Sequence, residues 1–466
     1  MKRLKREILE DYEVALNRPA GTRAVQFGDD ATLLGLVDRL IDDGNANGLD
    51  VGVAVVQAGS EGFAKELKEQ DGLFTTFVRG DLNEKEVHRE QVVQSVLTAL
   101  APETDDEALM ALARDEGVRF AVLHEDETGE FAARDAVCAA LAARFLVERW
   151  RAGLDGMAVI VCGGDEACAE RAKARMLAFA QGWRADEAFG RWLDGCRFFP
   201  ALADCLTVRS DAKEAARLCA QMNYADAMIH LAEPYGLWAI QADAAFRAEF
   251  PMDRYCGQIE FTDDLAPYFL KKQRLFDAGL FAMAALGCLH GDDTLAECMK
   301  DEPLRELVGH ALYDELLPYV PLPRDEVVRY VISCYERYEN PLNDNAIPDA
   351  ARGLIRRFNL GVLPAIRAYA DEHFAPPENL TVALAATVML YADARPKDGG
   401  YFTVVGQEEL RLHESPEVLA EFSRLSSDMS PDSLAYAVLS DRVLWNGCDL
   451  REIDGLFELL VRNLSE

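Results

Sequence analysis

Basic residues are scarce in this chain of 466 residues. It carries 48 lysines and arginines against 81 aspartates and glutamates, which is a formal net charge of −33 at pH 7. A surface of that charge repels nucleic acid and anionic lipid, so neither is an expected partner. The acidic residues are spread along the chain and are not gathered in a tail, which is typical of solvated helix faces.

Targeting signals and long apolar runs are also missing. The basic start, Met1-Lys-Arg-Leu-Lys-Arg, is not followed by an apolar stretch and so does not predict a signal peptide. The longest nearly uncharged apolar run, Leu380 to Ala392, is too short to span a bilayer and predicts a buried core helix. We therefore expect a cytoplasmic protein with no membrane association.

None of the 11 cysteines forms a C-x-x-C pair, and Cys162 and Cys168 are the closest two in sequence. Their odd number and wide spacing exclude a disulfide scaffold and a cysteine metal site. The seven histidines show no ligand spacing, and no Gly-x-Ser-x-Gly, His-Glu-x-x-His or P-loop pattern occurs. The sequence therefore predicts reduced, mostly buried thiols and no metal site.

Strand-like and helical patterns alternate in the first half of the chain. Val51 to Val56 and Met157 to Cys162 are continuous apolar runs, as a sheet buried on both faces requires. Residues 31–41 have apolar side chains at helical spacing. After about residue 260 the strand-like runs become rare and helical patterns take over. The pattern predicts an α/β domain with a parallel sheet, followed by a mostly α-helical domain.

The turn after the first strand is where a Rossmann-type fold binds a dinucleotide's pyrophosphate. Gly28 stands at the first glycine position of this turn, and Asp30 stands at the second. Asp29 and Asp30 put two carboxylates at the helix N-terminus, where each stabilises the helix by about 0.3–1 kcal/mol and repels a phosphate. Two interpretations stay open: an acidic N-cap that binds nothing, or a cofactor bound by Gly28, Asp29 and Asp30 in a modified mode.

Several motifs occur in an order and spacing that are specific only when they are taken together. They are Gln26-Phe-Gly28, Asp71-Gly-Leu-Phe-Thr-Thr-Phe-Val-Arg-Gly80, Ala232-Glu233, Asp263-Asp-Leu-Ala-Pro-Tyr268, Leu322-Pro-Arg-Asp-Glu326 and Asn340-Pro341. Over nearly its whole length the chain resembles the mannitol dehydrogenase family of long-chain polyol and sugar-acid dehydrogenases, and most closely its tagaturonate reductases (altronate oxidoreductases). The resemblance implies a Rossmann-like domain at residues 1–260, an all-helical domain at residues 261–466, the cofactor NAD(H), a sugar-acid or polyol substrate and no metal.

The resemblance also implies a lysine that takes the alcohol proton and asparagines that hold the developing oxyanion. It places this lysine at Lys272, a family asparagine at Asp277 and a family histidine at Leu280. A carboxylate near Lys272 stabilises the ammonium form and makes the lysine a poorer base. An ionised Asp277 and Leu280 donate no hydrogen bond to an oxyanion, and losing one such donor typically costs about 10²–10³ in rate.

Further site residues follow from the same resemblance. Glu127 matches the glutamate of a Thr-Glu-x-Gly stretch and is a third catalytic candidate beside Lys272 and Asp277. Cys196 stands at a second asparagine position. The substrate-binding candidates are Glu233, Asn340, Asn345 and Arg357. Simpler interpretations stay open: a surface lysine at 272, a solvated acidic loop at 127 and a buried structural carboxylate at 233.

Three functions are compatible with this pattern. The first is a nicotinamide-dependent oxidoreductase that resembles a tagaturonate reductase, with several catalytic positions replaced. The second is a catalytically inactive homologue that binds a small ligand, and the third is an interaction protein that keeps only the fold. Cofactor binding separates the first function from the other two.

Overall fold

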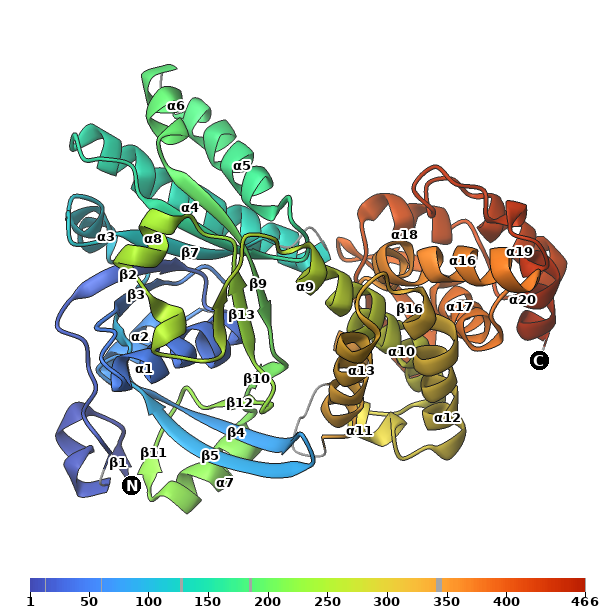
Figure 1. Cartoon of the computed structure of the whole chain (residues 1–466), viewed down its shortest axis with the longest axis horizontal. Coiled ribbons are helices and arrows are strands. Elements are labelled where there is room, and N and C mark those ends of the chain that lie inside the picture. Colours follow the sequence, from blue (N-terminus) through green and yellow to red (C-terminus); the bar gives the residue numbers. More distant parts are fainter. Residues whose placement is uncertain (13, 60, 126–128, 184–186, 341–345, 466) are drawn as a thin grey trace. The chain divides into compact units, whose positions relative to one another are not determined.

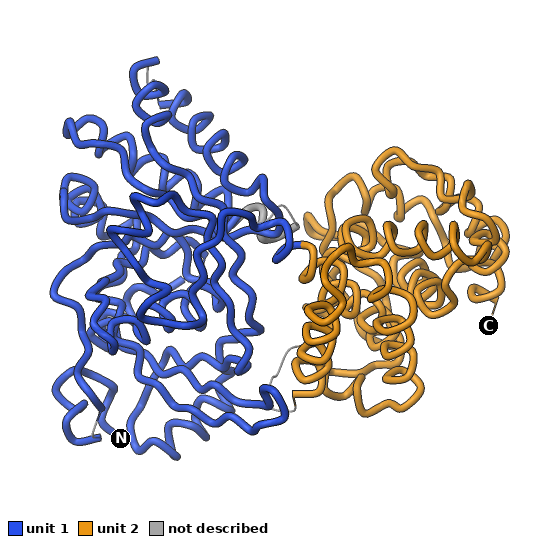
Figure 2. Tube along the Cα trace, viewed as in Figure 1, with its two compact units in different colours: residues 1–127, 131–269 blue, residues 128–130, 270–466 orange. Residues whose placement is uncertain are grey.

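The computed structural model describes the whole chain except residues 13, 60, 126–128, 184–186, 341–345 and 466. The chain forms two compact units (Figure 2), one of residues 1–127 and 131–269 and the other of residues 128–130 and 270–466. The domain boundary that we expect after residue 260 falls inside the first unit, near its end. The division into domains at this residue stays a prediction.

An eight-stranded sheet organises the first unit. In spatial order its strands are β14 (Ile259–Phe261), β13 (Leu237–Ile240), β9 (Arg197–Asp204), β8 (Ala158–Gly163), β7 (Phe120–Glu125), β2 (Thr22–Phe27), β3 (Gly52–Val56) and β6 (Val96–Leu100). Strands β9 through β6 run parallel, and β13 runs antiparallel to β9. The predicted parallel sheet is therefore confirmed. Its strand order reverses between β2 and β7, and at such a switch point open α/β sheets bind their ligands.

Helices cover both faces of this sheet (Figure 1), because its strands present apolar side chains on both sides. In β8, Ala158 and Ile160 pack on one face while Val159 and Val161 pack on the other. The first face carries the π-helical turn Leu33–Asp38, α1 (Arg39–Ala46), α2 (Phe63–Glu69) and α8 (Ala244–Glu249). The second carries α3 (Asp106–Ala113), α4 (Gly129–Arg151), α5 (Cys168–Gly182) and α6 (Glu187–Asp194).

A second sheet in the first unit was not predicted from the sequence. Its strands are β10 (Thr207–Arg209), β12 (His230–Ala232), β4 (Phe74–Leu82) and β5 (Lys85–Val93) in spatial order. Strand β5 lies at the edge and carries Lys85, Glu86, Arg89 and Glu90 as exposed residues. Charged side chains protect an edge strand from further pairing, and they also remove the apolar pattern by which a strand is recognised.

The second unit is mostly helical. At its centre α10 (Ala278–His290) packs against α17 (Glu378–Tyr391), and both helices are buried nearly all round. This confirms the core helix predicted from the apolar run at 380–392. The surrounding helices include α11 (Leu295–Cys298), α12 (Glu302–His310), α13 (Arg324–Glu339), α14 (Ile347–Ala350), α15 (Leu354–Arg357), α16 (Leu363–His373), α18 (Pro416–Phe422), α19 (Pro431–Ser440) and α20 (Leu456–Ser465). The short helix α9 (Ala266–Lys271) begins in the first unit and ends in the second.

A small antiparallel sheet corrects the expectation of an all-helical second domain. Its strands are β15 (Arg395–Lys397), β16 (Gly400–Val405) and β17 (Glu408–Leu412). A tight turn joins the first two strands, with Lys397 paired to Gly400. Asp398 and Gly399 have φ of 49° and 76° there, as a two-residue hairpin loop requires.

The cysteines are free thiols, and ten of the eleven are buried, as the sequence predicts. Within the described ranges, no group of three histidine, cysteine, aspartate or glutamate side chains could hold a metal ion. Nor does any helix in that part of the chain have the length and apolarity needed to cross a membrane.

Candidate active site

The turn after β2 places Gly28, Asp29 and Asp30 at the carboxyl end of a central strand. Gly28 has φ of 129°, a conformation that side chains disfavour, so glycine suits this position. Oδ1 of Asp30 accepts a hydrogen bond from the backbone N–H of Leu33 at 3.0 Å. This contact is an N-cap, so the acidic cap predicted from the sequence is present.

Asp29 links this turn to the loop after β3. Its Oδ1 accepts hydrogen bonds from the backbone N–H groups of Gly59 at 3.1 Å and Ala58 at 3.4 Å. Amides in such turns are the donors that a Rossmann-type fold offers to a phosphate. Here the chain's own carboxylates accept from them. The turn in this state therefore does not fit a pyrophosphate.

Two basic side chains lie beside Asp30. Its Oδ2 is 3.8 Å from Nδ1 of His124, in β7, and 3.8 Å from the guanidinium of Arg134, in α4. Asp135 is fully buried, with its Oδ1 3.8 Å from Nε of Arg134. Burial, together with the charges of Asp135 and Asp30, raises the pKa of the Cys138 thiol. Sequence reasoning missed Arg134, because only the packing of α4 against the sheet brings it to this turn.

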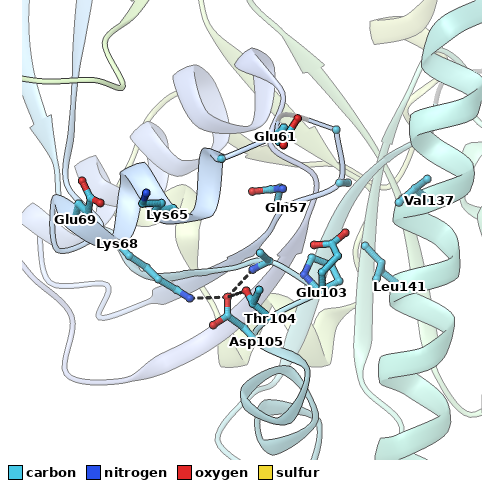
Figure 3. Close-up of a pocket in the computed structure, with 15 residues that line it drawn as sticks. Gln57, Glu61, Lys65, Lys68, Glu69, Glu103, Thr104, Asp105, Val137 and Leu141 are labelled. Carbon is cyan, nitrogen blue, oxygen red and sulfur yellow. Dashed lines mark hydrogen bonds and ion pairs between the residues drawn. The ribbon is translucent and has the colours of Figure 1, made fainter.

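A pocket of about 860 Å³ lies beside the turn, at the carboxyl ends of β3 and β6 (Figure 3). Gln57 follows β3 and lines it, and Val137 and Leu141 of α4 give it an apolar wall. Lys68 of α2 forms an ion pair with Asp105 at 2.5 Å at its edge. The volume, the mixed lining and the position next to the switch point suit a small-molecule site.

In the second unit Lys272 begins a π-helical turn, Lys272–Asp277, between α9 and α10. Residues five apart lie about 140° apart round an α-helix, but the wider π-helical turn brings them to nearly the same face. The Lys272 amine donates a hydrogen bond to Oδ1 of Asp277 at 2.8 Å, and the two side chains are 24% and 16% exposed. The structure thus brings two of the three predicted catalytic residues together as an ion pair.

An aromatic and charged cluster surrounds this ion pair. The guanidinium of Arg337 lies 3.6 Å from the ring centre of Phe276, and the lysine amine lies 5.5 Å from the same ring. The Tyr338 hydroxyl donates a hydrogen bond to the carbonyl of Phe276 at 2.6 Å. Burial raises the pKa of Tyr338, Asp277 raises it further and Arg357 opposes the rise. Arg357 therefore belongs to the same electrostatic neighbourhood as the predicted pair.

Glu233 is buried and bonded to the backbone. Its Oε1 accepts a hydrogen bond from the N–H of Leu206 at 2.6 Å, and its own N–H donates to the carbonyl of Leu206 at 3.1 Å. Such a reciprocal pair satisfies buried polar groups of two adjoining loops. The contacts favour the buried structural carboxylate over a substrate contact.

The other predicted substrate residues fall in different places. Asn340 is buried at the carboxyl end of α13. Arg357 ends α15, and its guanidinium donates a hydrogen bond to the carbonyl of Ala350. Glu127 and Asn345 lie outside the described residues.

At Leu280 and Cys196 the resemblance implies a hydrogen-bond donor in the family, and neither side chain here is a strong donor. Leu280 is buried within α10. Cys196 is also buried, and burial raises the pKa of its thiol to about 11. The thiol is therefore neutral and only a weak donor at pH 7.

The chain is similar to known proteins over most of its length. The family model described as the mannitol dehydrogenase C-terminal domain matches residues 264–465. An altronate oxidoreductase of Klebsiella pneumoniae (strain 342) is 30% identical over 464 residues, which are 95% of this chain and 94% of that protein. An altronate oxidoreductase of Shigella flexneri serotype 5b (strain 8401) is 28% identical over the same shares of both chains.

Two solved structures have the same fold. Pseudomonas fluorescens mannitol 2-dehydrogenase, in a ternary complex with NAD and D-mannitol, superposes with a TM-score of 0.75 at 19% identity, over 99% of this chain and 96% of that one. A D-sorbitol dehydrogenase in substrate-free form also has a TM-score of 0.75, at 17% identity, over 99% of this chain and 97% of that one. They confirm the predicted α/β domain followed by a mostly helical one.

Proposed function

Because the chain belongs to the mannitol dehydrogenase family, we propose that it is an oxidoreductase that interconverts a sugar acid or polyol and its keto form. By analogy with the altronate oxidoreductases, the substrate pair we favour is D-tagaturonate and D-altronate. One observation carries the proposal. The Lys272 amine, which the resemblance places at the family's lysine position, is held 2.8 Å from Asp277 on a π-helical turn.

Lys272 moves the proton in this proposal. Reduction of a carbonyl requires a proton at the oxygen, and the ammonium of Lys272 is a suitable general acid. Its ion pair with Asp277 at 2.8 Å holds the amine in a fixed position. In the reverse direction Lys272 accepts the proton of the alcohol. Asp277, when ionised, orients the amine but donates nothing to an oxyanion.

The cofactor we expect is NAD(H), which supplies or accepts the hydride when bound, and we expect no metal. The pocket at the ends of β3 and β6 fits the nucleoside end, because Val137 and Leu141 offer an apolar wall and Gln57 a polar group. The turn at Gly28 does not fit the pyrophosphate until its carboxylates move. We expect the protein to act in the cytoplasm, where thiols stay reduced.

Thermal unfolding with millimolar NADH or NADPH tests the cofactor. A ligand present at about 100 times its Kd stabilises by about 2.7 kcal/mol, which moves the unfolding midpoint measurably. A shift with either cofactor supports the proposal, and no shift with both contradicts it.

Tagaturonate reduction, followed by NADH consumption, then tests the lysine. Lys272→Met is expected to lose activity by about 10² or more, which is typical of a removed acid–base group. Lys271→Met is the matched control: the same charge is lost at the next residue, where the amine pairs with Glu326 at 2.5 Å.

A catalytically inactive homologue that binds a sugar acid or a protein partner is the second candidate. The observation that favours it is that Asp29 and Asp30 accept hydrogen bonds from the amides that a phosphate needs. It predicts a shift of the unfolding midpoint with the sugar acid alone and no turnover with either cofactor.

A further inference from the structure

Tyr338 contacts the turn that carries Lys272 and Asp277 from a neighbouring helix. Its side chain is fully buried near the carboxyl end of α13, and its hydroxyl donates a hydrogen bond to the carbonyl of Phe276 at 2.6 Å. Phe276 directly precedes Asp277 in the π-helical turn. The rings of Tyr338 and Phe276 also pack against each other, with their centres 5.2 Å apart. Tyr338 therefore contacts both the backbone and the side chain of the residue next to the ion pair.

Gly279 leaves the space that this hydroxyl occupies. The glycine lies in the first turn of α10, where an added Cβ would be 2.4 Å from the Tyr338 hydroxyl oxygen and 3.1 Å from the ring carbons Cε2 and Cζ. A side chain at this position would therefore displace the hydroxyl from the carbonyl of Phe276. The hydrogen bond thus depends on a matched pair, a tyrosine on α13 and a glycine on α10.

The Tyr338 hydroxyl keeps its proton at neutral pH. Burial raises the pKa of Tyr338 well above its usual range, and the charge of Asp277 adds to the rise, although Arg337 and Arg357 oppose it. The hydroxyl is therefore a hydrogen-bond donor and not a base. A buried donor of this kind needs an acceptor, and the Phe276 carbonyl supplies one.

We propose that Tyr338 is a positioning residue, which holds the turn on which Lys272 meets Asp277 and so places the amine for proton transfer. The inference rests on the proposed function, because it concerns the proton transfer by Lys272. Without the hydroxyl, the Phe276 carbonyl loses a buried donor and the turn is held less firmly. The 2.8 Å contact of the Lys272 amine then varies, and the amine meets the substrate oxygen less often in the required geometry. A displacement of about 1 Å in such an arrangement can cost about 10²-fold in rate.

Acetylation of lysines by N-hydroxysuccinimide acetate, quantified by peptide mass spectrometry, tests the position of the amine without turnover. The Lys272 amine must leave its carboxylate partner before it attacks the reagent, so its rate reports how firmly the ion pair is held. Tyr338→Phe removes one oxygen atom and is expected to raise the rate at Lys272, relative to exposed Lys85, by about 2- to 10-fold, the range that one hydrogen bond is worth. Tyr391→Phe is the matched control, because it removes the hydroxyl of another fully buried tyrosine of the second unit, which donates to a backbone carbonyl at 3.3 Å. It should leave the rate at Lys272 unchanged.

Steady-state kinetics of tagaturonate reduction then test whether this position matters for the chemistry. Tyr338→Phe is expected to lower kcat by about tenfold or more with little change in KM, because the buried hydroxyl does not contact the substrate. The solvent isotope effect of D2O on kcat should rise, since proton transfer becomes slower relative to the other steps. Gly279→Ala displaces the same hydroxyl and should act in the same direction. The double variant should lose less than the two single losses combined, as expected of residues that act through one contact.

The outcomes separate this inference from the proposed function. Equal acetylation of Lys272 in the wild type and Tyr338→Phe overturns the inference and leaves the oxidoreductase intact. Faster acetylation with an unchanged kcat and isotope effect reduces Tyr338 to a structural residue and also overturns it. No turnover by the wild type overturns the proposed function, and the acetylation rates then still decide whether Tyr338 holds the ion pair.

Discussion

Asp277 forms an ion pair with Lys272, and its carboxylate lies 2.8 Å from the amine. An ionised carboxylate accepts hydrogen bonds but donates none, so it gives no support to a developing oxyanion. Leu280, further along α10, gives none either. At the residue scale, the proposed function therefore assigns the proton transfer to Lys272 and expects no oxyanion donor from Asp277 or Leu280.

Asp277→Asn is expected to raise kcat/KM for tagaturonate reduction by about 10- to 100-fold. The amide can donate to the oxyanion, and one such donor is typically worth 10² or more in rate. Initial rates of NADH consumption measure the change. Asp314→Asn is the control, because Asp314 is 66% exposed and pairs with His310 on the surface of the same unit. A loss of activity in Asp277→Asn would mean that the ion pair itself is required.

At the scale of single elements, two π-helical turns support the lysine. The turn Lys272–Asp277 packs against a second one, Phe358–Val362. Gly361, in the second turn, faces the backbone carbonyl of Gln273 in the first. A π-helical turn inside an α-helix is uncommon and frequently marks a functional site. The close approach at Gly361 requires a residue without a side chain.

Gly361→Ala is expected to lower the free energy of unfolding by about 1–3 kcal/mol. The added Cβ would lie closer to the Gln273 carbonyl than real Cβ atoms come, so the two turns must separate. Urea unfolding measures the loss. Gly190→Ala is the control, since this glycine of α6 faces open space and alanine there should stabilise by up to about 1 kcal/mol. Equal stability of Gly361→Ala and wild type would contradict the contact.

The start of α15 is capped by a buried carboxyl group. Oε1 of Glu414 accepts a hydrogen bond from the N–H of Ile355 at 2.6 Å. Burial raises the pKa of Glu414 from 4.5 to about 7, although the amides of Ile355 and Arg356 and the charge of Arg357 oppose the rise. Between these two values the folded state keeps a proton that the unfolded chain has lost. The free energy of unfolding therefore falls as pH rises from about 4.5 to 7.

Glu414→Gln is expected to remove this decline, because glutamine keeps an acceptor for the cap and has no proton to lose. The full effect is on the order of 3 kcal/mol. Denaturant unfolding at pH 5 and pH 8 measures it: relative to wild type, the variant should gain stability at the higher pH. Glu408→Gln, at an exposed position in β17, should follow the wild type. Parallel pH curves for Glu414→Gln and wild type would rule out the titration.

At the scale of the whole molecule, the net charge of −33 lowers the stability of the folded state. Like charges on a compact surface repel one another, and the unfolded chain relieves this repulsion. Salt screens it, since the Debye length falls from about 30 Å at 0.01 M to about 8 Å at 0.15 M. The molecule should accordingly be least stable at low ionic strength.

Raising sodium chloride from about 0.01 M to 0.15 M is therefore expected to raise the unfolding midpoint, by roughly 1 °C for each kcal/mol of repulsion that is screened. Thermal unfolding across a salt series measures this. Choline chloride at equal ionic strength should give the same rise, which separates screening from specific ion binding. A midpoint that falls with salt would show that ion pairs outweigh the repulsion.

The sequence by itself determined the features that repeat locally. Continuous apolar runs such as Val51 to Val56 have to be buried on both faces, which requires a sheet covered by helices on both sides. The run at 380–392 is apolar all round, so it became a core helix. Motif order was enough to identify the family, and Asp30 at the second glycine position was enough to predict an acidic cap.

Only the tertiary structure decided which distant groups meet. Arg134 reaches Asp30 because α4 packs on the sheet beside β2, and no spacing in the sequence encodes that contact. The contact between Asp29 and Gly59 joins loops that follow different strands. Strand β5 and the sheet of β15 to β17 were not predicted from the sequence. Edge and hairpin strands form by backbone hydrogen bonding to a neighbouring strand, so their side chains need not show an apolar pattern. The π-helical turn that pairs Lys272 with Asp277 lies against Gly361 of another helix, a contact that no spacing in the sequence encodes.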